Sequence, residues 1–486
     1  MTKWMNKEIG ELHEALVRKE VTPLELVEDC IAGIGEDRVN AFEAKAFDEA
    51  RKQASRITEV KEDEFLKGIP YLAKDNYSTK GIETTASSRI LEGYVPLYDA
   101  TVISKLRRAG MILVAKTTMD ELAMGGTGTT GHLGPTLNPY DPSRIVGGSS
   151  CGSAAALAEG IAPLALGSDT GDSVRKPASH AGLCGYKATW GRISRYGLFP
   201  FACSLDAVGF FTRDVLDASY VLSALSGHDH NDMSSSYRRK EKYENYVLGH
   251  KTLPRVGYFK AVMDAISDPV IKAAYVGLLE KLRKNGHEIV SYDYPVDLLD
   301  ALYPTYMLIS CAEATSNDAN LDGIKFGPAA KHDPKTWEEY MTQCRTDGFS
   351  DLIKRRFVIG SFSLLSQNQE EMFCRAQKAR RRIVRELNRF FDSVDYLVVP
   401  AAYSIPKKVS ELETRWSTKP DFLDNILTLG NFGGNPSLTV PLTFENGLPI
   451  GVNVTGRVFE DGYVMGLGSE IESLTGLKDL VAKEAR

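Results

Sequence analysis

The chain has 486 residues, of which 43% are hydrophobic and 25% are charged. These values are typical of a globular protein with a sizeable core. The 58 basic and 64 acidic side chains give a net charge of −6, which argues against a protein that binds nucleic acid on its own.

The N-terminal half predicts alternating strands and helices. In Thr22-Pro23-Leu24-Glu25, a capping residue precedes a proline at the first helical position and a glutamate at the third, which predicts a helix start. The other elements expected here are a strand over 67–73, a helix over 101–108, a strand over 112–115, a loop over 127–153, a helix over 153–161 and a strand over 164–166.

The C-terminal half continues this alternation after a polar stretch at 228–250, which is a candidate inserted loop or boundary. The expected strands cover 255–258, 288–292, 396–400, 437–442 and 450–454, and the expected helices cover 269–284 and 367–391. Strands that alternate with helices along most of a chain predict an α/β fold, with one large sheet between helices. We therefore expect a single domain over 1–486.

Three side chains in glycine-rich or turn-prone segments are candidates for catalysis. They are Lys74 in Gly-Ile-Pro-Tyr-Leu-Ala-Lys74, Ser149 in Gly-Gly-Ser149-Ser and Ser173 in Asp-Thr-Gly-Asp-Ser173. A serine hydroxyl becomes a useful nucleophile when a neighbour takes its proton, and burial can keep a lysine neutral enough to act as a base. Two serines and a lysine can therefore transfer an acyl group from an amide without histidine or metal.

A second reading of the same region is the nucleophile elbow of a Ser-His-Asp hydrolase. Gly148-Ser-Ser150-Cys-Gly152 matches its Gly-x-Ser-x-Gly pattern, with Ser150 as the nucleophile. That elbow requires a strand immediately before it, and the preceding residues predict a loop. A metal-dependent reaction is not expected, because the sequence has no His-Glu-x-x-His motif and no cluster of ligand residues.

The motifs around these residues resemble the amidase signature family, and within it the glutamine-hydrolysing subunits of tRNA-dependent amidotransferases. Besides the segments of Lys74, Ser149 and Ser173, the matching pieces include Gly191-Arg-Ile-Ser-Arg-Tyr-Gly-Leu198, Ala312-Glu-Ala-Thr-Ser-Asn317 and Pro436-Ser-Leu-Thr-Val-Pro441. The resemblance covers nearly the whole chain. It implies the amidase signature fold, a large mixed β-sheet between helices, with a signature core over about 65–215.

The resemblance also implies a mechanism. Ser173 is the nucleophile, and Ser149, joined to Gly148 by a cis peptide, passes protons between Ser173 and Lys74. Backbone N–H groups of Thr170, Gly171, Asp172 and Ser173 form the oxyanion hole, where the loss of one donor typically costs about 10²–10³ in rate. The acyl-enzyme releases ammonia, and water then frees glutamate.

For glutamine itself, the resemblance implies groups that hold both charges of its α-carbon end. The carboxylate is assigned to an arginine in Lys354-Arg355-Arg356, with Arg356 preferred over Arg355, because a guanidinium binds carboxylates bidentately. The ammonium is assigned to Asp424, and Tyr306 is expected to line the pocket.

The family resemblance implies that partner subunits activate the glutamate on tRNA and transfer ammonia to it. We expect two other subunits, a tRNA-binding subunit that activates the glutamate and transfers ammonia to it, and a small linker subunit. ATP and Mg²⁺ are expected in the tRNA-binding partner, with no cofactor and no metal in this chain. The N-terminus has no apolar signal core and the seven cysteines are scattered, which favours the cytoplasm or a mitochondrial matrix. No segment is apolar enough for a membrane.

The sequence departs from the family pattern beside the nucleophile, where Asp172 replaces the second glycine of Thr-Gly-Gly-Ser. If this residue had positive φ, its side chain would add strain of roughly 1 kcal/mol or more, and its charge would oppose an oxyanion. Two alternatives stay open, and Asp172 supports only the second. One is a stand-alone amidase that hydrolyses a small carboxamide, and the other is a structural subunit without turnover.

Overall fold

A computed structural model describes residues 4–35, 37–412 and 421–482. Within these residues, eleven strands form one mixed sheet, with the strand order β1-β3-β2-β4-β6-β5-β10-β11-β9-β7-β8. The strands are β1 (Phe42–Lys45), β2 (Pro70–Lys74), β3 (Ile112–Thr117), β4 (Ala165–Asp169), β5 (Cys184–Lys187), β6 (Ala207–Thr212), β7 (Arg255–Phe259), β8 (Glu288–Tyr292), β9 (Tyr396–Pro400), β10 (Ser437–Glu445) and β11 (Leu448–Gly456).

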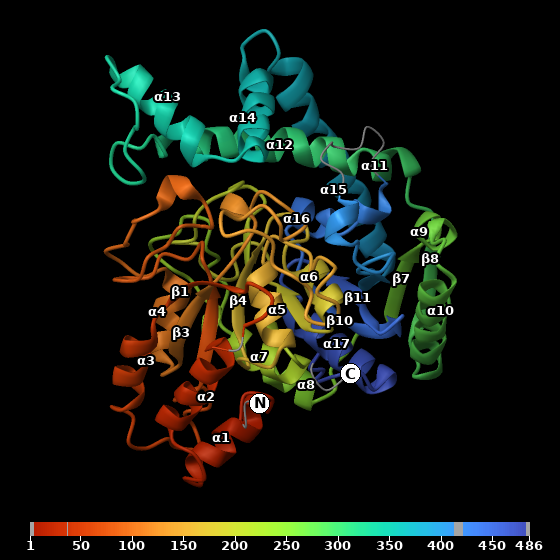
Figure 1. Cartoon of the computed structure of the whole chain (residues 1–486). Coiled ribbons are helices and arrows are strands. Elements are labelled where there is room, and N and C mark those ends of the chain that lie inside the picture. The colour runs from red at the N-terminus through yellow and green to blue at the C-terminus, as the bar shows by residue number, and fades with distance from the viewer. Residues whose placement is uncertain (1–3, 36, 413–420, 483–486) are drawn as a thin grey trace.

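Helices surround this sheet and extend beyond one end of it (Figure 1). They are α1 (Ile9–Val17), α2 (Pro23–Gly35), α3 (Phe47–Ala54), α4 (Thr101–Arg108), α5 (Cys151–Ala158), α6 (Arg175–Ala181), α7 (Val215–Leu225), α8 (Glu244–Leu248), α9 (Lys260–Ala265), α10 (Pro269–Lys284), α11 (Val296–Asp300), α12 (Leu302–Asn317), α13 (Trp337–Gly348), α14 (Asp351–Leu364), α15 (Arg375–Ser393), α16 (Thr428–Gly433) and α17 (Asp461–Thr475). Among the described helices, none is long and apolar enough to span a bilayer. The expected α/β fold with a large mixed sheet is confirmed.

Three parallel strands define the edge at which the candidate catalytic residues meet. β2 pairs in parallel with β3 on one side and with β4 on the other, with Leu72 opposite Ala165 and Ala73 opposite Leu166. The carboxyl ends of these strands therefore lie side by side. In open α/β sheets, ligands bind at this edge.

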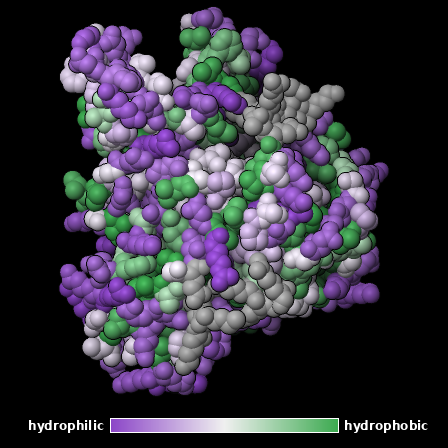
Figure 2. All heavy atoms as spheres, viewed as in Figure 1, coloured by the Kyte–Doolittle hydropathy of each residue, from purple (hydrophilic) through white to green (hydrophobic). Residues whose placement is uncertain are grey.

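A separate layer of helices lies above the sheet. Figure 1 shows α12, α13 and α14, drawn in green to teal, at the top of the molecule, while α1 and α17 lie in its lower half. α12 packs against α14 and α15, and Ile309, Ile353 and Leu387 of these three helices are buried in the same hydrophobic cluster. Figure 2 shows hydrophobic side chains on this upper projection, where Val358 and Phe362 of α14 are exposed.

The regular elements follow the sequence pattern closely where the pattern is strong. α4, α10, β8 and β9 have the expected bounds, whereas β10 and β11 are longer than expected. The helix expected over 367–391 begins at Arg375, after a π-helical turn over Glu370–Cys374. The polar stretch 228–250 ends in α8, which packs on α7 and α17. The single-domain boundary remains a prediction.

Candidate active site

Lys74, the last residue of β2, is the centre of a buried polar cluster. Its side chain is fully buried, and its ammonium nitrogen Nζ lies 2.8 Å from Ser149 Oγ. Nζ also lies 3.0 Å from both Ser150 Oγ and Ser168 Oγ. In the described part of the chain, no carboxylate forms an ion pair with Lys74. Three hydroxyl groups therefore surround a lysine that has no paired charge.

This environment changes the proton affinity of the lysine. Burial lowers the pKa of Lys74 from 10.5 to about 8, although the more distant charges of Asp120, Asp169 and Asp206 partly oppose the shift. Desolvation disfavours the charged amine because the protein interior solvates a cation poorly. A large fraction of Lys74 is thus neutral at mildly alkaline pH, as a general base requires.

Ser149 lies in a tight loop whose backbone is held by Asp120. The peptide between Gly148 and Ser149 is cis, as the family resemblance implies. The Asp120 carboxylate accepts hydrogen bonds from the backbone N–H groups of Gly128 at 2.9 Å and Thr129 at 3.0 Å, and Asp120 N–H donates to Ser149 O at 3.1 Å. A Cβ at Gly148 would lie 2.0 Å from Asp120 Oδ2. Only glycine therefore fits at this position.

Ser173 lies in the turn between β4 and α6. Its carbonyl oxygen accepts a hydrogen bond from Ser150 N–H at 3.2 Å, so the backbone joins the 170–173 turn to the Ser149 loop. Ser173 is 4% exposed, and no described residue forms a hydrogen bond with its side chain. The hydroxyl is therefore not committed to a structural contact.

The turn before Ser173 presents several free backbone donors. The N–H groups of Thr170, Gly171, Asp172 and Ser173 have no acceptor among the described residues. Successive unpaired N–H groups in a turn form an anion-binding nest. Asp172 is not among the residues with positive φ, so the strain considered above does not arise. Such a nest can stabilise an oxyanion.

Buried side chains fix the conformation of this turn. The Arg175 guanidinium forms a double hydrogen bond with Asp169, at 3.1 and 2.9 Å, and also donates to Gly171 O at 2.7 Å. Burial would raise the pKa of Asp169, but the charge and hydrogen bonds of Arg175 outweigh it and hold the value at about 2. Asn431 of α16 bridges the pair, because it accepts from Arg175 at 2.6 Å and donates to Asp169 at 2.9 Å.

Asp206 supports the turn from its other side. Its carboxylate accepts a hydrogen bond from the Thr170 hydroxyl at 2.7 Å and from the backbone N–H groups of Phe201 and Ala202 at 2.9 and 3.0 Å. Burial raises the pKa of Asp206 to about 6. The residue therefore connects the 170–173 turn to the segment that carries Phe201.

Two of the expected substrate-binding residues approach the nucleophile turn from the upper helices. Tyr306 of α12 packs on the turn so closely that a Cβ at Gly171 would lie 3.2 Å from its ring. Arg356 of α14 is 9% exposed, its guanidinium lies 5.6 Å from the centre of the Phe201 ring, and its Nε has no hydrogen-bond partner. Phe201 also contacts Tyr306, with 6.5 Å between ring centres.

The other two expected binding residues have different surroundings. Arg355 is exposed on the outer side of α14, whereas Arg356 is buried beside Phe201. Asp424 is exposed, and its backbone carbonyl accepts a hydrogen bond from Lys176 at 2.8 Å. The structure therefore gathers Lys74, Ser149 and the Ser173 turn, adds Tyr306 and Arg356 nearby, and leaves Arg355 outside the group.

Sequence reasoning missed two members of the cluster around Lys74. Ser168 Oγ accepts hydrogen bonds from Lys74 and, at 2.9 Å, from the amide of Asn76. Ser150 was considered only as the nucleophile of an elbow, but it follows a loop rather than a strand, and its hydroxyl donates to Ser168 O at 3.2 Å. No local pattern indicates this contact, because it is the parallel pairing of β2 with β4 that places residue 74 near residue 168.

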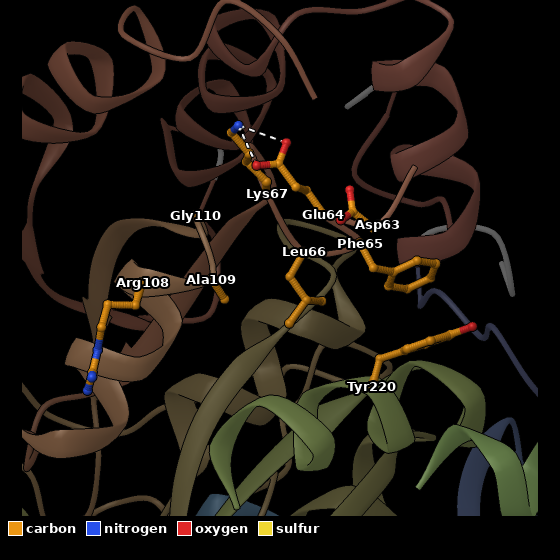
Figure 3. Close-up of a pocket in the computed structure, with 9 residues that line it drawn as sticks. All are labelled: Asp63, Glu64, Phe65, Leu66, Lys67, Arg108, Ala109, Gly110 and Tyr220. Atoms are coloured by element: carbon orange, nitrogen blue, oxygen red, sulfur yellow. Dashed lines mark hydrogen bonds and ion pairs between the residues drawn. The ribbon is translucent and has the colours of Figure 1, made fainter. Parts of the chain in front are cut away.

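A pocket of about 390 Å³ lies away from this cluster (Figure 3). It is lined by the segment 63–67, by Arg108 at the end of α4 and by Tyr220 of α7, whose ring stacks on Phe65 with 3.7 Å between ring centres. The segment 63–67 enters β2 at its amino end, whereas Lys74 closes the carboxyl end of the same strand. The pocket and the candidate active site are thus at opposite ends of the sheet.

Comparison with known proteins shows the family of this chain. The family described as Amidase matches residues 25–465. A glutamyl-tRNA(Gln) amidotransferase subunit from Listeria monocytogenes is 37% identical over 478 residues, which cover 96% of this chain and 97% of that protein. The crystal structure of the corresponding glutamyl-tRNA(Gln) amidotransferase subunit from Thermotoga maritima superposes with a TM-score of 0.78 and 32% identity, and the match covers 97% and 95% of the two chains.

The peptide amidase of Stenotrophomonas maltophilia shares the fold at 24% identity, with a TM-score of 0.82 and coverage of 98% and 99%. The family match and the full-length relatives define an enzyme that acts on amide bonds. This chain belongs to the amidase family.

Proposed function

We propose that this chain is the glutaminase subunit of a tRNA-dependent amidotransferase, which supplies ammonia for the conversion of Glu-tRNA(Gln) to Gln-tRNA(Gln). The observation that carries the proposal is the contact between the buried Lys74 amine and the Ser149 hydroxyl, at 2.8 Å. The relatives named for this activity match the chain over almost its whole length.

In this mechanism Ser173 Oγ attacks the side-chain amide carbon of glutamine. The Ser173 proton passes to Ser149, and the Ser149 proton passes to neutral Lys74. The free N–H groups of the 170–173 turn stabilise the oxyanion. When the tetrahedral intermediate collapses, the proton returns through Ser149 to the leaving nitrogen, and ammonia departs. Water then attacks the Ser173 ester, and glutamate is released.

The residues that hold the substrate come from the upper layer of helices. Arg356 is a cation whose Nε lacks a partner, and a substrate carboxylate would satisfy it. Tyr306 forms one wall beside the nucleophile turn, and Asp424 is assigned to the substrate ammonium. Arg355 faces outward and serves as the comparison for Arg356.

The proposal assigns ATP, Mg²⁺ and tRNA to a partner subunit, with a small linker subunit completing a heterotrimer. Ammonia formed at Ser173 would pass to that partner. The reaction would take place where aminoacyl-tRNA is made, in the cytoplasm or in a mitochondrial matrix.

The test is ammonia release from glutamine by the chain alone, and by the chain with its partner subunits and charged tRNA. We expect turnover that depends on the partners and is lost in Ser173→Ala. Fast hydrolysis of other small carboxamides by the isolated chain, with glutamine left intact, would instead establish the stand-alone amidase.

A further inference from the structure

An ion pair stands directly beside the nucleophile. The Asp172 carboxylate lies 3.1 Å from the Lys176 ammonium, and the two side chains are 22% and 18% exposed. The pair is also joined through the backbone, because Lys176 N–H donates to Asp172 O at 2.9 Å in the first turn of α6. Asp172 immediately precedes Ser173, so this carboxylate is covalently tied to the turn whose N–H groups would hold an oxyanion.

Lys176 makes a second contact that fixes its position. Its ammonium donates to the backbone carbonyl of Asp424 at 2.8 Å. The lysine thus bridges the nucleophile turn and the segment assigned to the ammonium of the substrate. A cation held by two oxygen acceptors at these distances has little freedom to move away from Asp172.

The electrostatics of the two groups differ. Burial raises the pKa of Asp172, and the charge of Lys176 opposes that shift. Burial alone would lower the pKa of Lys176, but the charges of Asp172 and Asp424 outweigh it, so that the pKa is raised. Lys176 therefore keeps its proton throughout the neutral range, and a full positive charge faces the carboxylate.

An unpaired carboxylate at residue 172 would act against catalysis. Two like charges at close range repel more strongly in a partly desolvated site than in water. The oxyanion formed during attack by Ser173 carries the same sign as Asp172. The carboxylate is compatible with a working oxyanion hole only if a fixed cation cancels its field.

We propose that Lys176 is a positioning residue that neutralises Asp172 and keeps the 170–173 turn electropositive, so that the two residues function as one unit. This inference rests on the proposed role of Ser173 as the nucleophile, and it does not depend on glutamine being the substrate. Neutralisation by Lys176 explains how an amide-hydrolysing site can have an aspartate next to its nucleophile without repelling the oxyanion.

The inference predicts a particular pattern in a double-mutant cycle. Lys176→Gln leaves the carboxylate uncompensated, and we expect kcat to fall roughly tenfold, less than the loss of a direct oxyanion donor. KM should change little. Asp172→Asn supplies the remaining corner of the cycle, and Asp172→Asn combined with Lys176→Gln should recover most of the activity lost in Lys176→Gln. Lys176→Arg keeps the charge and should stay near wild type.

Two readouts separate this inference from the proposed function. The first is the kcat and KM for ammonia release from glutamine by the complete complex. The second is the rate at which a fluorophosphonate probe labels Ser173 in the isolated chain. In that reaction the Ser173 oxygen bonds to phosphorus, the phosphorus–fluorine bond breaks, and the proton leaves through Ser149 to Lys74. The negative charge that develops on the phosphoryl oxygen during the attack makes the labelling rate a measure of the oxyanion hole without any substrate.

A matched control is available on α1. Glu14 and Arg18 form an exposed pair with the same order and spacing, acid first and base four residues later, at 3.0 Å. Arg18→Gln should leave both readouts unchanged. Thermal unfolding of every variant shows whether it is folded. If Lys176→Gln does not fold, a folded and active double variant still supports charge compensation.

The outcomes are distinct. The wild-type complex could fail to release ammonia from glutamine while the double variant regains the rate of probe labelling that Lys176→Gln loses. In that case the proposed function fails and this inference holds. If Lys176→Gln labels as fast as wild type, the inference is wrong. It is also wrong if the double variant is as slow as Lys176→Gln, because Lys176 would then act through packing rather than through the charge of Asp172.

Discussion

The amine nitrogen of Lys74 lies 2.8 Å from the hydroxyl oxygen of Ser149, and both side chains are fully buried. One residue ends a β-strand, and the other lies in a glycine-rich loop 75 positions later. Because burial lowers the pKa of Lys74 to about 8, the contact joins an amine that is partly neutral at this pH to a hydroxyl, as the proposed proton relay requires.

The first prediction concerns the pH dependence of the reaction. Neutral Lys74 is the active form, so kcat/KM should rise as pH increases through about 8 and level off above it. Initial rates between pH 6 and 10 test this. A profile that is flat across this range, or one that falls with increasing pH, would contradict a lysine base.

The second prediction separates the function of Lys74 from its effect on stability. Lys74→Met should abolish turnover. It should also remove the pH dependence of stability that Lys74 causes. Between about pH 8 and 10.5 the Lys74 amine is protonated in the unfolded chain but largely neutral in the folded chain. In wild type, Lys74 therefore makes the free energy of unfolding increase with pH in this range. Urea unfolding at pH 8 and 10, compared between the two proteins, measures the difference.

The third prediction concerns Ser168, which positions the lysine. Ser168→Ala would leave Lys74 and the amide of Asn76 each without one acceptor in a buried site. We expect a loss of stability of about 1–3 kcal/mol and a fall in kcat. Ser153→Ala is the control, because Ser153 is also buried but donates to Leu166 O at 2.8 Å and does not contact Lys74. It should lose stability and keep kcat, and equal losses of kcat in both variants would exclude this role.

The fourth prediction concerns the buried pair of Asp169 and Arg175. Asp169→Asn removes one partner and should cost about 3–5 kcal/mol, because it leaves the guanidinium without its charge partner. Asp169→Leu combined with Arg175→Met should cost less. Guanidinium chloride unfolding of the three proteins provides the comparison, and a double variant less stable than Asp169→Asn would show that packing dominates.

The same pair makes the protein sensitive to acid. Since the pKa of Asp169 is about 2 in the folded state and about 3.8 in the unfolded chain, its stabilisation is complete above pH 3.8 and is lost as pH falls towards 2. The shift corresponds to about 2 kcal/mol. The free energy of unfolding of the wild type should therefore fall more steeply between pH 4 and 2 than that of the double variant.

The fifth prediction distinguishes the two neighbouring arginines of α14. Arg356→Gln should raise KM for glutamine by roughly 10–100-fold, which corresponds to the loss of a charged hydrogen bond. Arg355→Gln should leave KM unchanged, because that side chain is exposed on the outer face of the helix. Steady-state kinetics of both variants test this. The reverse result would move the carboxylate contact to Arg355.

Much of the fold could be predicted from local patterns. The helix at α10 has a proline at its first turn, and Asp268 caps it with hydrogen bonds to Val270 and Ile271, so its start is encoded within a few residues. β9 is a short run of buried apolar residues. The prediction was less successful at α15, because the charge pattern of 367–391 does not show the π-helical turn that precedes Arg375.

The sequence alone was enough to select the candidate residues Lys74, Ser149 and Ser173. Each lies in a glycine-rich or turn-prone segment, and such a segment can be recognised from a few neighbouring residues. The sequence also determined the family, since those segments carry the matching motifs. Only the tertiary structure decided which groups meet. Ser168 joins Lys74 through the parallel pairing of β2 with β4, Arg356 rather than Arg355 faces Phe201, and Asp172 is paired with Lys176. Each of these depends on strand register or helix orientation, which are set by packing between segments distant in sequence and not by any local pattern.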